Sequence, residues 1–165
     1  MGQPLMIKSN AVFVVALLLA NACGAAPRAD EQVAREIVYR FGEGYTQAAI
    51  DLAAPSKVRT FRAEAALVRK EFRGSGIAAS WLVSPAAPDK QAPIALRVSR
   101  PGHLVSELYI GTSSPADIQK QLGAPDESGP NWMAYRGLAE ICSDKFTFRF
   151  AEGTLSEVAW EWCTD

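Results

Sequence analysis

The chain is poor in histidine, and this scarcity limits the chemistry it can perform. Its one histidine, His103, follows Pro101-Gly102 in a turn-like sequence. Catalytic triads and histidine-based metal sites need an imidazole beside other reactive groups, so a single turn histidine argues against both. Ser75 lacks the glycine spacing of a nucleophile elbow, and Asp126 and Glu127 are neighbours in a loop. We therefore expect a protein that is not an enzyme and that needs no cofactor and no metal.

A long hydrophobic run is also absent. The apolar run from Ala11 to Ala20 has ten residues, whereas a membrane-spanning helix needs about 20. Lys8 precedes this run as the only charge in the first 27 residues, and Ala20-Asn21-Ala22 ends it with small residues. A basic start, a short apolar stretch and a small-residue site are typical of a secretory signal peptide, which we predict over residues 1–22.

Cys23 directly follows the small residues, so two processing routes are open. The site resembles a bacterial lipobox, in which the cysteine becomes the diacylated first residue, although Ala20 replaces the usual leucine three positions earlier. This resemblance implies a lipidated Cys23, a linker over residues 23–30 and, because Gly24 rather than Asp follows, an outer-membrane location. The alternative is cleavage by ordinary signal peptidase, which would give a soluble periplasmic or secreted protein.

Cysteine is scarce as well. An exported chain with three cysteines leaves one over, and lipidation of Cys23 would leave Cys142 and Cys163 as a pair. An oxidising compartment lets such a pair form a disulfide, which we predict.

The residues between these two cysteines suggest a hairpin. A two- or four-residue turn at Ala151–Thr154, with Gly153 at positive φ, places Phe150 opposite Leu155 and Lys145 opposite Trp160. In that register the two cysteines stand directly opposite each other. A three-residue turn would shift the pairing and place Cys142 opposite Trp162 instead.

No excess of charge of either sign is present. The chain has 17 Lys and Arg against 18 Asp and Glu, a net charge of −1. Nucleic-acid binding calls for a basic stripe, so the balance argues against a nucleic-acid partner. The length left after the signal suits one domain, which we place at residues 31–165.

The pattern of apolar residues, glycines and prolines predicts helices first and strands later. Helix is expected over residues 30–45 and, in a short second piece, 46–54, whereas 57–73 is ambiguous between helix and strand. The clearest helix starts at Ser114 and Pro115 and stops at Gly123 and Pro125. Strands are expected at residues 77–83, 94–99, 104–110, 132–136, 142–150 and 155–163, with a surface loop at 85–93. Leu52-Ala53-Ala54-Pro55 echoes Leu122-Gly123-Ala124-Pro125, but the flanking residues differ and chance explains the echo better than duplication.

The C-terminal third resembles a known family. Ile110-Gly111-Thr112 precedes the capped helix, Trp132 and Tyr135 follow it, and the last strands contain Gly153 and Val158. Over residues 107–162 this order resembles the SmpA/OmlA domain of BamE-like outer-membrane lipoproteins. The resemblance implies an α+β fold, with short helices packed on one face of an antiparallel β-meander and an N-terminal helical segment before it. It also implies a non-catalytic assembly module anchored in the membrane by lipid alone.

A second function is consistent with the same fold. The β-lactamase inhibitor protein has the helix-on-meander arrangement in duplicate, so the alternative is an inhibitor or immunity-type protein that caps an exported enzyme. In either case we expect the partner to be another envelope protein.

Alternation along the last strands suggests which side chains meet that partner. If Phe146, Phe148 and Phe150 face the helices, simple pairing leaves Trp160 and Trp162 on the open face. Exposed aromatic residues among polar ones commonly mark contact surfaces. The candidate partner-binding residues are Trp132, Lys145, Arg149, Trp160 and Trp162. The alternative is that the N-terminal region covers this face and the tryptophans belong to the core.

Overall fold

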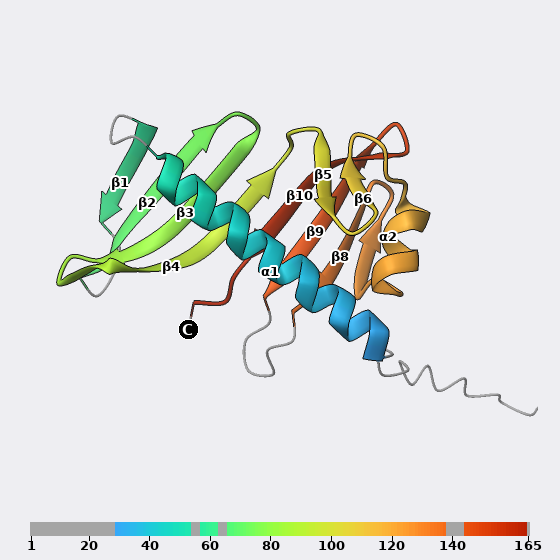
Figure 1. Cartoon of the computed structure of the whole chain (residues 1–165), viewed down its shortest axis with the longest axis horizontal. Helices are drawn as coiled ribbons and strands as arrows, with labels where there is room; N and C mark the ends of the chain where they lie inside the picture. The colour runs from blue at the N-terminus through green and yellow to red at the C-terminus, as the bar shows by residue number, and fades with distance from the viewer. Residues whose placement is uncertain (1–28, 54–56, 63–65, 138–143, 165) are drawn as a thin grey trace, which may run out of the picture.

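An eight-stranded antiparallel sheet forms the centre of the computed structural model, which describes residues 29–53, 57–62, 66–137 and 144–164 (Figure 1). The strand order is β1-β2-β3-β4-β10-β9-β8-β7. The bounds are β1 Val58–Arg62, β2 Val68–Gly74, β3 Ile77–Ser84, β4 Ala87–Val98, β7 Glu127–Gly129, β8 Trp132–Arg136, β9 Lys145–Ala151 and β10 Thr154–Glu161. Strands β5 (Gly102–Val105) and β6 (Leu108–Ile110) form a separate hairpin.

The sheet consists of two meanders with the same topology. Strands β1 to β4 neighbour one another in chain order, as do β7 to β10, and the antiparallel pair β4 and β10 joins the two sets. This arrangement relates the halves by a two-fold axis perpendicular to the sheet. Each half follows a helix that ends at a leucine of the echoed motif, Leu52 or Leu122. The two halves therefore share a strand order, although the helices before them differ in length, with 24 residues in α1 and 8 in α2.

Helix α1 (Ala29–Leu52) crosses one face of the sheet as a single 24-residue helix (Figure 1). We expected a break between two helices near Gly42, Gly44 and Tyr45. Both glycines instead lie inside α1, which continues past Tyr45 without a break. Gly42 has a packing role: a Cβ built on it would lie 2.4 Å from Trp160 Nε1, so only glycine lets the helix approach the sheet this closely. The Trp160 indole donates a hydrogen bond to the Val38 carbonyl over 3.2 Å, which anchors the same part of α1.

Helix α2 (Pro115–Leu122) begins and ends as the sequence predicts. The Ser114 Oγ accepts a hydrogen bond from the Asp117 backbone N–H, and the Asp117 carboxylate accepts one from the Ser114 N–H, which completes a capping box. The bonds that the Ser114 backbone N–H and then its hydroxyl donate to the Asp117 carboxylate hold the pKa of Asp117 below its usual value. Gly123 ends the helix at φ +76°.

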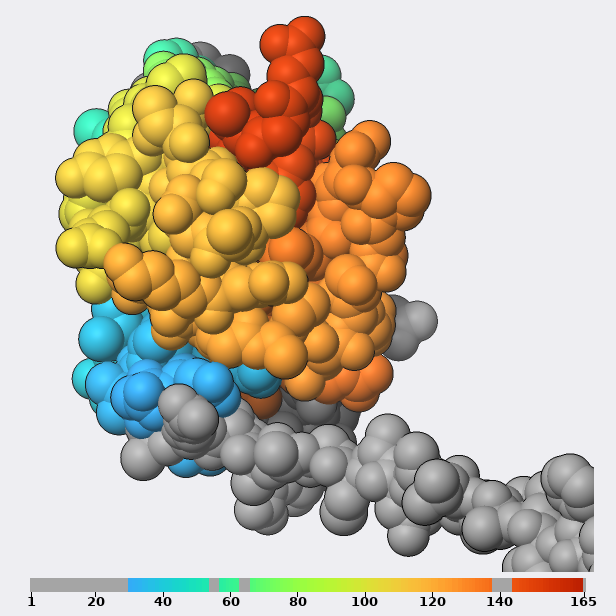
Figure 2. All heavy atoms as spheres, turned by 90° about the vertical axis from the view of Figure 1, so that its right-hand side faces the viewer, coloured from blue at the N-terminus to red at the C-terminus, as the bar shows by residue number. Residues whose placement is uncertain are grey.

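Helices α1 and α2 lie side by side at one end of the molecule (Figure 2). Arg35 of α1 connects them: its guanidinium donates to the Leu122 carbonyl over 3.4 Å, the Ala124 carbonyl over 3.2 Å and Asp126 Oδ2 over 3.2 Å. Because Asp126 accepts one of these bonds, it has a structural role at the end of α2. Burial raises the pKa of the neighbouring Tyr135 phenol above its usual range.

The expected fold class is wrong in its main element. We predicted short helices on a meander, whereas the described residues form one eight-stranded sheet, a separate hairpin and two helices. Helix α1 packs on β3 and β4 of one half and on Trp160 of β10 in the other. The ambiguous segment 57–73 contains β1 and β2, and the expected loop at 85–93 belongs mostly to β4. The prolines of this segment led to the loop prediction. Pro93 pairs with Trp81 next to a register shift, and a strand tolerates proline at such an irregularity.

The hairpin of β9 and β10 has the predicted turn but not the predicted register. Glu152 and Gly153 have φ of +52° and +79°, as a two-residue hairpin turn of type I′ requires, and Phe150 pairs with Leu155 as expected. A bulge between Leu155 and Glu157 then shifts the pairing by one. Lys145 consequently faces Glu161 rather than Trp160.

The shift changes the argument for the disulfide. Cys163 is disulfide-bonded, and its backbone N–H donates to Asp144 Oδ1 over 2.6 Å. Cys142 lies outside the described residues, so its pairing with Cys163 stays a prediction. The bulge removes the reason for expecting the two residues directly opposite each other.

The expected signal peptide and lipidation site also lie outside the described residues, and both stay predictions. Within the residues that the structure describes, neither helix combines the length and apolar character that crossing a membrane requires.

Candidate outer-face interface

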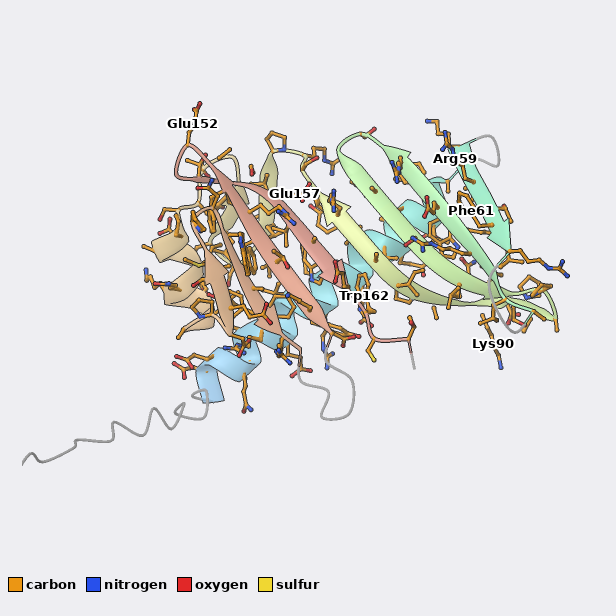
Figure 3. All side chains as sticks on the ribbon, turned by 180° about the vertical axis from the view of Figure 1, so that it is seen from behind. Arg59, Phe61, Lys90, Glu152, Glu157 and Trp162 are labelled. Atoms are coloured by element: carbon orange, nitrogen blue, oxygen red, sulfur yellow. The ribbon has the colours of Figure 1, made fainter. Side chains whose placement is uncertain are left out.

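The face of the sheet opposite α1, here called the outer face, is the candidate site. No described helix lies over it, as the view from behind shows (Figure 3). Strand pairing defines its members, because side chains alternate between the two faces and paired residues share a face. The row Ala78, Arg97, Ala159, Thr147 and Ala134 crosses five strands of this face.

The outer face is more positive than the protein as a whole. Seven cationic and four anionic side chains occupy its paired positions among the described strands, which gives a net charge of +3. The cations are Arg59, Arg69, Arg73, Arg97, Arg136, Lys145 and Arg149, and the anions are Glu71, Glu127, Glu157 and Glu161. Because the full chain has a net charge of −1, the remainder carries −4. The outer face is therefore positive while the rest of the chain is negative.

Three glutamates on this face are each held between two cations. Glu157 Oε1 lies 3.4 Å from Arg97 Nε and 3.3 Å from Arg149 Nε. Each such group keeps one net positive charge, and its pairs lie on the surface, where ion pairs contribute little to folding stability. This makes a role in recognition more reasonable than a role in stability.

The other two groups follow the same pattern at either end of the sheet. Glu71 lies 2.9 Å from Arg69 and 4.0 Å from Arg73. Glu127 lies 2.8 Å from Lys145 Nζ and 3.2 Å from Arg136. The hydrogen bond from Lys145 and its charge, followed by Arg136, hold the pKa of Glu127 below its usual value.

A shallow hollow of about 390 Å³ lies in the outer face over β2, β3, β4 and β10. Its floor consists of small side chains, Ala78, Ser80, Ala95 and Ala159. The charged side chains that line it are three arginines and two glutamates: Arg69, Arg73, Arg97, Glu71 and Glu161. Ser80 is only 5% exposed although it faces the uncovered side, since the longer side chains around it rise above the floor. The hollow therefore offers room for a protruding group among charged side chains, of which the arginines outnumber the glutamates by one.

The structure divides the predicted partner-binding residues between the two faces. Trp132, Lys145 and Arg149 lie together on the outer face: Trp132 pairs with Arg149, and Lys145 Nζ is 6.0 Å from the Trp132 ring centroid. The indole of Trp132 also packs against Gly129: a Cβ added to Gly129 would lie 2.3 Å from Trp132 Nε1.

The prediction that Trp160 and Trp162 are exposed is wrong. They are 1% and 8% exposed and lie under α1, because the bulge in β10 turns them to the same face as Phe146 and Phe148. The Tyr39 ring of α1 packs edge-on against Trp162 at 6.2 Å, and burial, with the nearby Asp144 carboxylate, raises the pKa of Tyr39 to about 12. Both tryptophans belong to the core, as the alternative interpretation had it.

The remaining polar candidates form no second site among the described residues. His103 is exposed, and its Nε2 lies 2.7 Å from the Ser106 carbonyl oxygen within its own hairpin. No group of three or more His, Cys, Asp or Glu side chains suited to a metal occurs in the described part of the chain.

Sequence reasoning missed the centre of the outer face. Arg97, Glu157 and the alanine floor are distant in sequence and meet only through the β4–β10 pairing. One local signal was available: Arg69, Glu71 and Arg73 alternate with period two, which indicates a strand with one charged face.

Comparisons with known proteins give no relative for this chain: no protein family matches it, and neither does any curated protein or solved structure.

Proposed function

We propose that this chain is an exported, non-catalytic protein-binding module of the cell envelope that holds its partner on the outer face. The observation that carries the proposal is the asymmetry of the sheet. One face is covered by α1, while the other is hollowed over small side chains and has a net charge of +3 against −1 for the chain. An antiparallel sheet with one solvated face is ordinary, but a hollow with a charge opposite to that of the protein favours a binding surface.

The location forms part of the same proposal. The signal-like residues 1–22 and the lipobox-like Cys23 support anchoring on the periplasmic side of the outer membrane, with soluble periplasmic or secreted protein as the alternative. A lipid-anchored, BamE-like assembly factor would use the outer face to hold another envelope protein.

The second candidate is an inhibitor or immunity-type protein, and the width of the sheet favours it. Eight strands from two meanders form one continuous face, which is suited to covering the site of a folded enzyme. Affinity separates the two functions: an inhibitor is expected to bind with a Kd near 1 nM or below, whereas an assembly contact tolerates weaker binding.

Site-specific cross-linking in the native host tests the proposal. A photoreactive phenylalanine analogue would replace Ala159 on the outer face or, as the control, Ala48, which is exposed on α1. We expect a covalent adduct with another polypeptide from position 159 and none from position 48. An adduct from position 48 alone, or from neither position, would contradict the proposal.

A further inference from the structure

We propose that the partner presents an acidic protein segment to the outer face and that a carboxylate of this segment enters the hollow beside Arg97. This inference rests on the proposed function and adds the chemistry of the partner. The charges of the outer face, the shape of the hollow and the distribution of the acids on the sheet support it.

The arginines around the hollow have donors directed at solvent. Arg73, Arg97 and Arg69 have side chains that are 81%, 59% and 46% exposed, and each forms an ion pair with one glutamate. A guanidinium has five N–H donors, so one contact with a glutamate leaves others able to bind an incoming carboxylate. Glu71 and Glu157 are each held by two arginines and would repel that carboxylate only weakly. Glu161 also lines the hollow and forms no ion pair among the described residues, so the carboxylate is expected on the side of the arginines.

The hollow determines where the carboxylate would fit. Ala78, Ser80, Ala95 and Ala159 keep its floor low across three neighbouring strands, so a protruding side chain can reach the level of Arg97 without displacing protein atoms. Ser80 adds a hydroxyl that can donate to the same group.

The distribution of acids favours a protein over an extended polyanion. Glu71, Glu157 and Glu161 lie among the cations, so a nucleic-acid backbone or an anionic membrane laid along the face would meet carboxylates as well as arginines. The rest of the chain, which has a net charge of −4, would also repel a long polyanion. A short acidic loop can contact the arginines and avoid both sources of repulsion. Two outer faces would repel each other, which disfavours face-to-face pairing of two copies.

Charge reversal tests the inference. Arg97→Glu and the control Arg40→Glu alter the net charge equally, and both side chains are exposed and paired with a glutamate, but Arg40 lies on α1. The full chain would be titrated with a short fluorescent peptide rich in Asp and Glu and, separately, with duplex DNA and with phosphatidylglycerol vesicles. We expect the acidic peptide to bind best, its affinity to fall at least about tenfold with Arg97→Glu and less than about twofold with Arg40→Glu, and binding to weaken with salt.

The cross-linked peptide supplies the second measurement. With the photoreactive residue at position 159, the adduct should join a peptide rich in Asp and Glu, and Arg97→Glu should reduce its yield. A neutral or basic peptide, or a yield unchanged by Arg97→Glu, would overturn this inference while leaving the proposed function intact. Adducts with nucleic acid, lipid or a second copy of the chain, or tighter binding to DNA or vesicles than to the short acidic peptide, would overturn it as well. Absence of any adduct would instead remove the proposed function.

Discussion

Replacing Trp160 by alanine is expected to lower the free energy of unfolding by about 3–5 kcal/mol. The side chain is 1% exposed, lies under α1 and donates a hydrogen bond to the Val38 carbonyl. Its removal would leave a large cavity between helix and sheet and would remove the indole's hydrogen bond to α1. Urea unfolding followed by circular dichroism would measure the change.

Trp132→Ala is the matched control for this substitution. Trp132 is only half-buried and lies on the outer face, so its loss is expected to cost about 1 kcal/mol or less while weakening partner binding. Equal losses of stability for the two variants, or a stable Trp160→Ala protein that fails to bind, would contradict the place of Trp160 in the core.

Gly42→Ala is expected to destabilise the protein by about 1–3 kcal/mol, against the usual preference for alanine in helices. The new methyl group would lie 2.4 Å from Trp160 Nε1 and 2.6 Å from Cδ1, so α1 must lift from the sheet or the indole must move. Thermal unfolding would report the loss as a lower midpoint.

Gly44→Ala provides the control two residues along the same helix. A Cβ at Gly44 has nothing within 4 Å, so alanine should stabilise α1 by about 0.5–1 kcal/mol. Opposite signs for the two substitutions would confirm that α1 approaches the sheet at Gly42. Stabilisation by both would contradict the described packing.

The sequence predicted those elements whose signals are local. Ser114, Pro115, Asp117 and Gly123 each act within one turn of helix, and α2 begins and ends where they indicate. The turn at Glu152 and Gly153 is equally local.

Elements set by tertiary contacts were missed. Gly42 and Gly44 resemble a helix end until Trp160 is placed beneath them, since a glycine needed for close packing and a glycine that stops a helix look alike in sequence. The pairing of β4 with β10, which completes the sheet, joins residues about sixty positions apart and has no local signal.

Three of the five predicted partner-binding residues lie on the outer face, and one inserted residue in β10 explains why the other two are buried. Simple alternation placed Trp160 on the open face, but the bulge at Ser156 inserts one residue and turns the rest of β10 over. Trp132, Lys145 and Arg149, which precede the bulge or lie on other strands, keep the predicted face. Bulges of this kind depend on neighbouring strands and are hard to read from one strand alone.

The most direct test of the central claim, that the outer face holds the partner, is the affinity of the cross-linked partner for a chain whose hollow has been filled. Ala159→Trp would occupy the hollow, whereas Ala48→Trp would add the same side chain to the exposed side of α1. With both variants folded by circular dichroism, we expect the Kd to rise at least about tenfold for Ala159→Trp and to stay within about twofold of the unmodified protein for Ala48→Trp. An unchanged Kd for Ala159→Trp, or an equal rise for both variants, would contradict binding at the outer face.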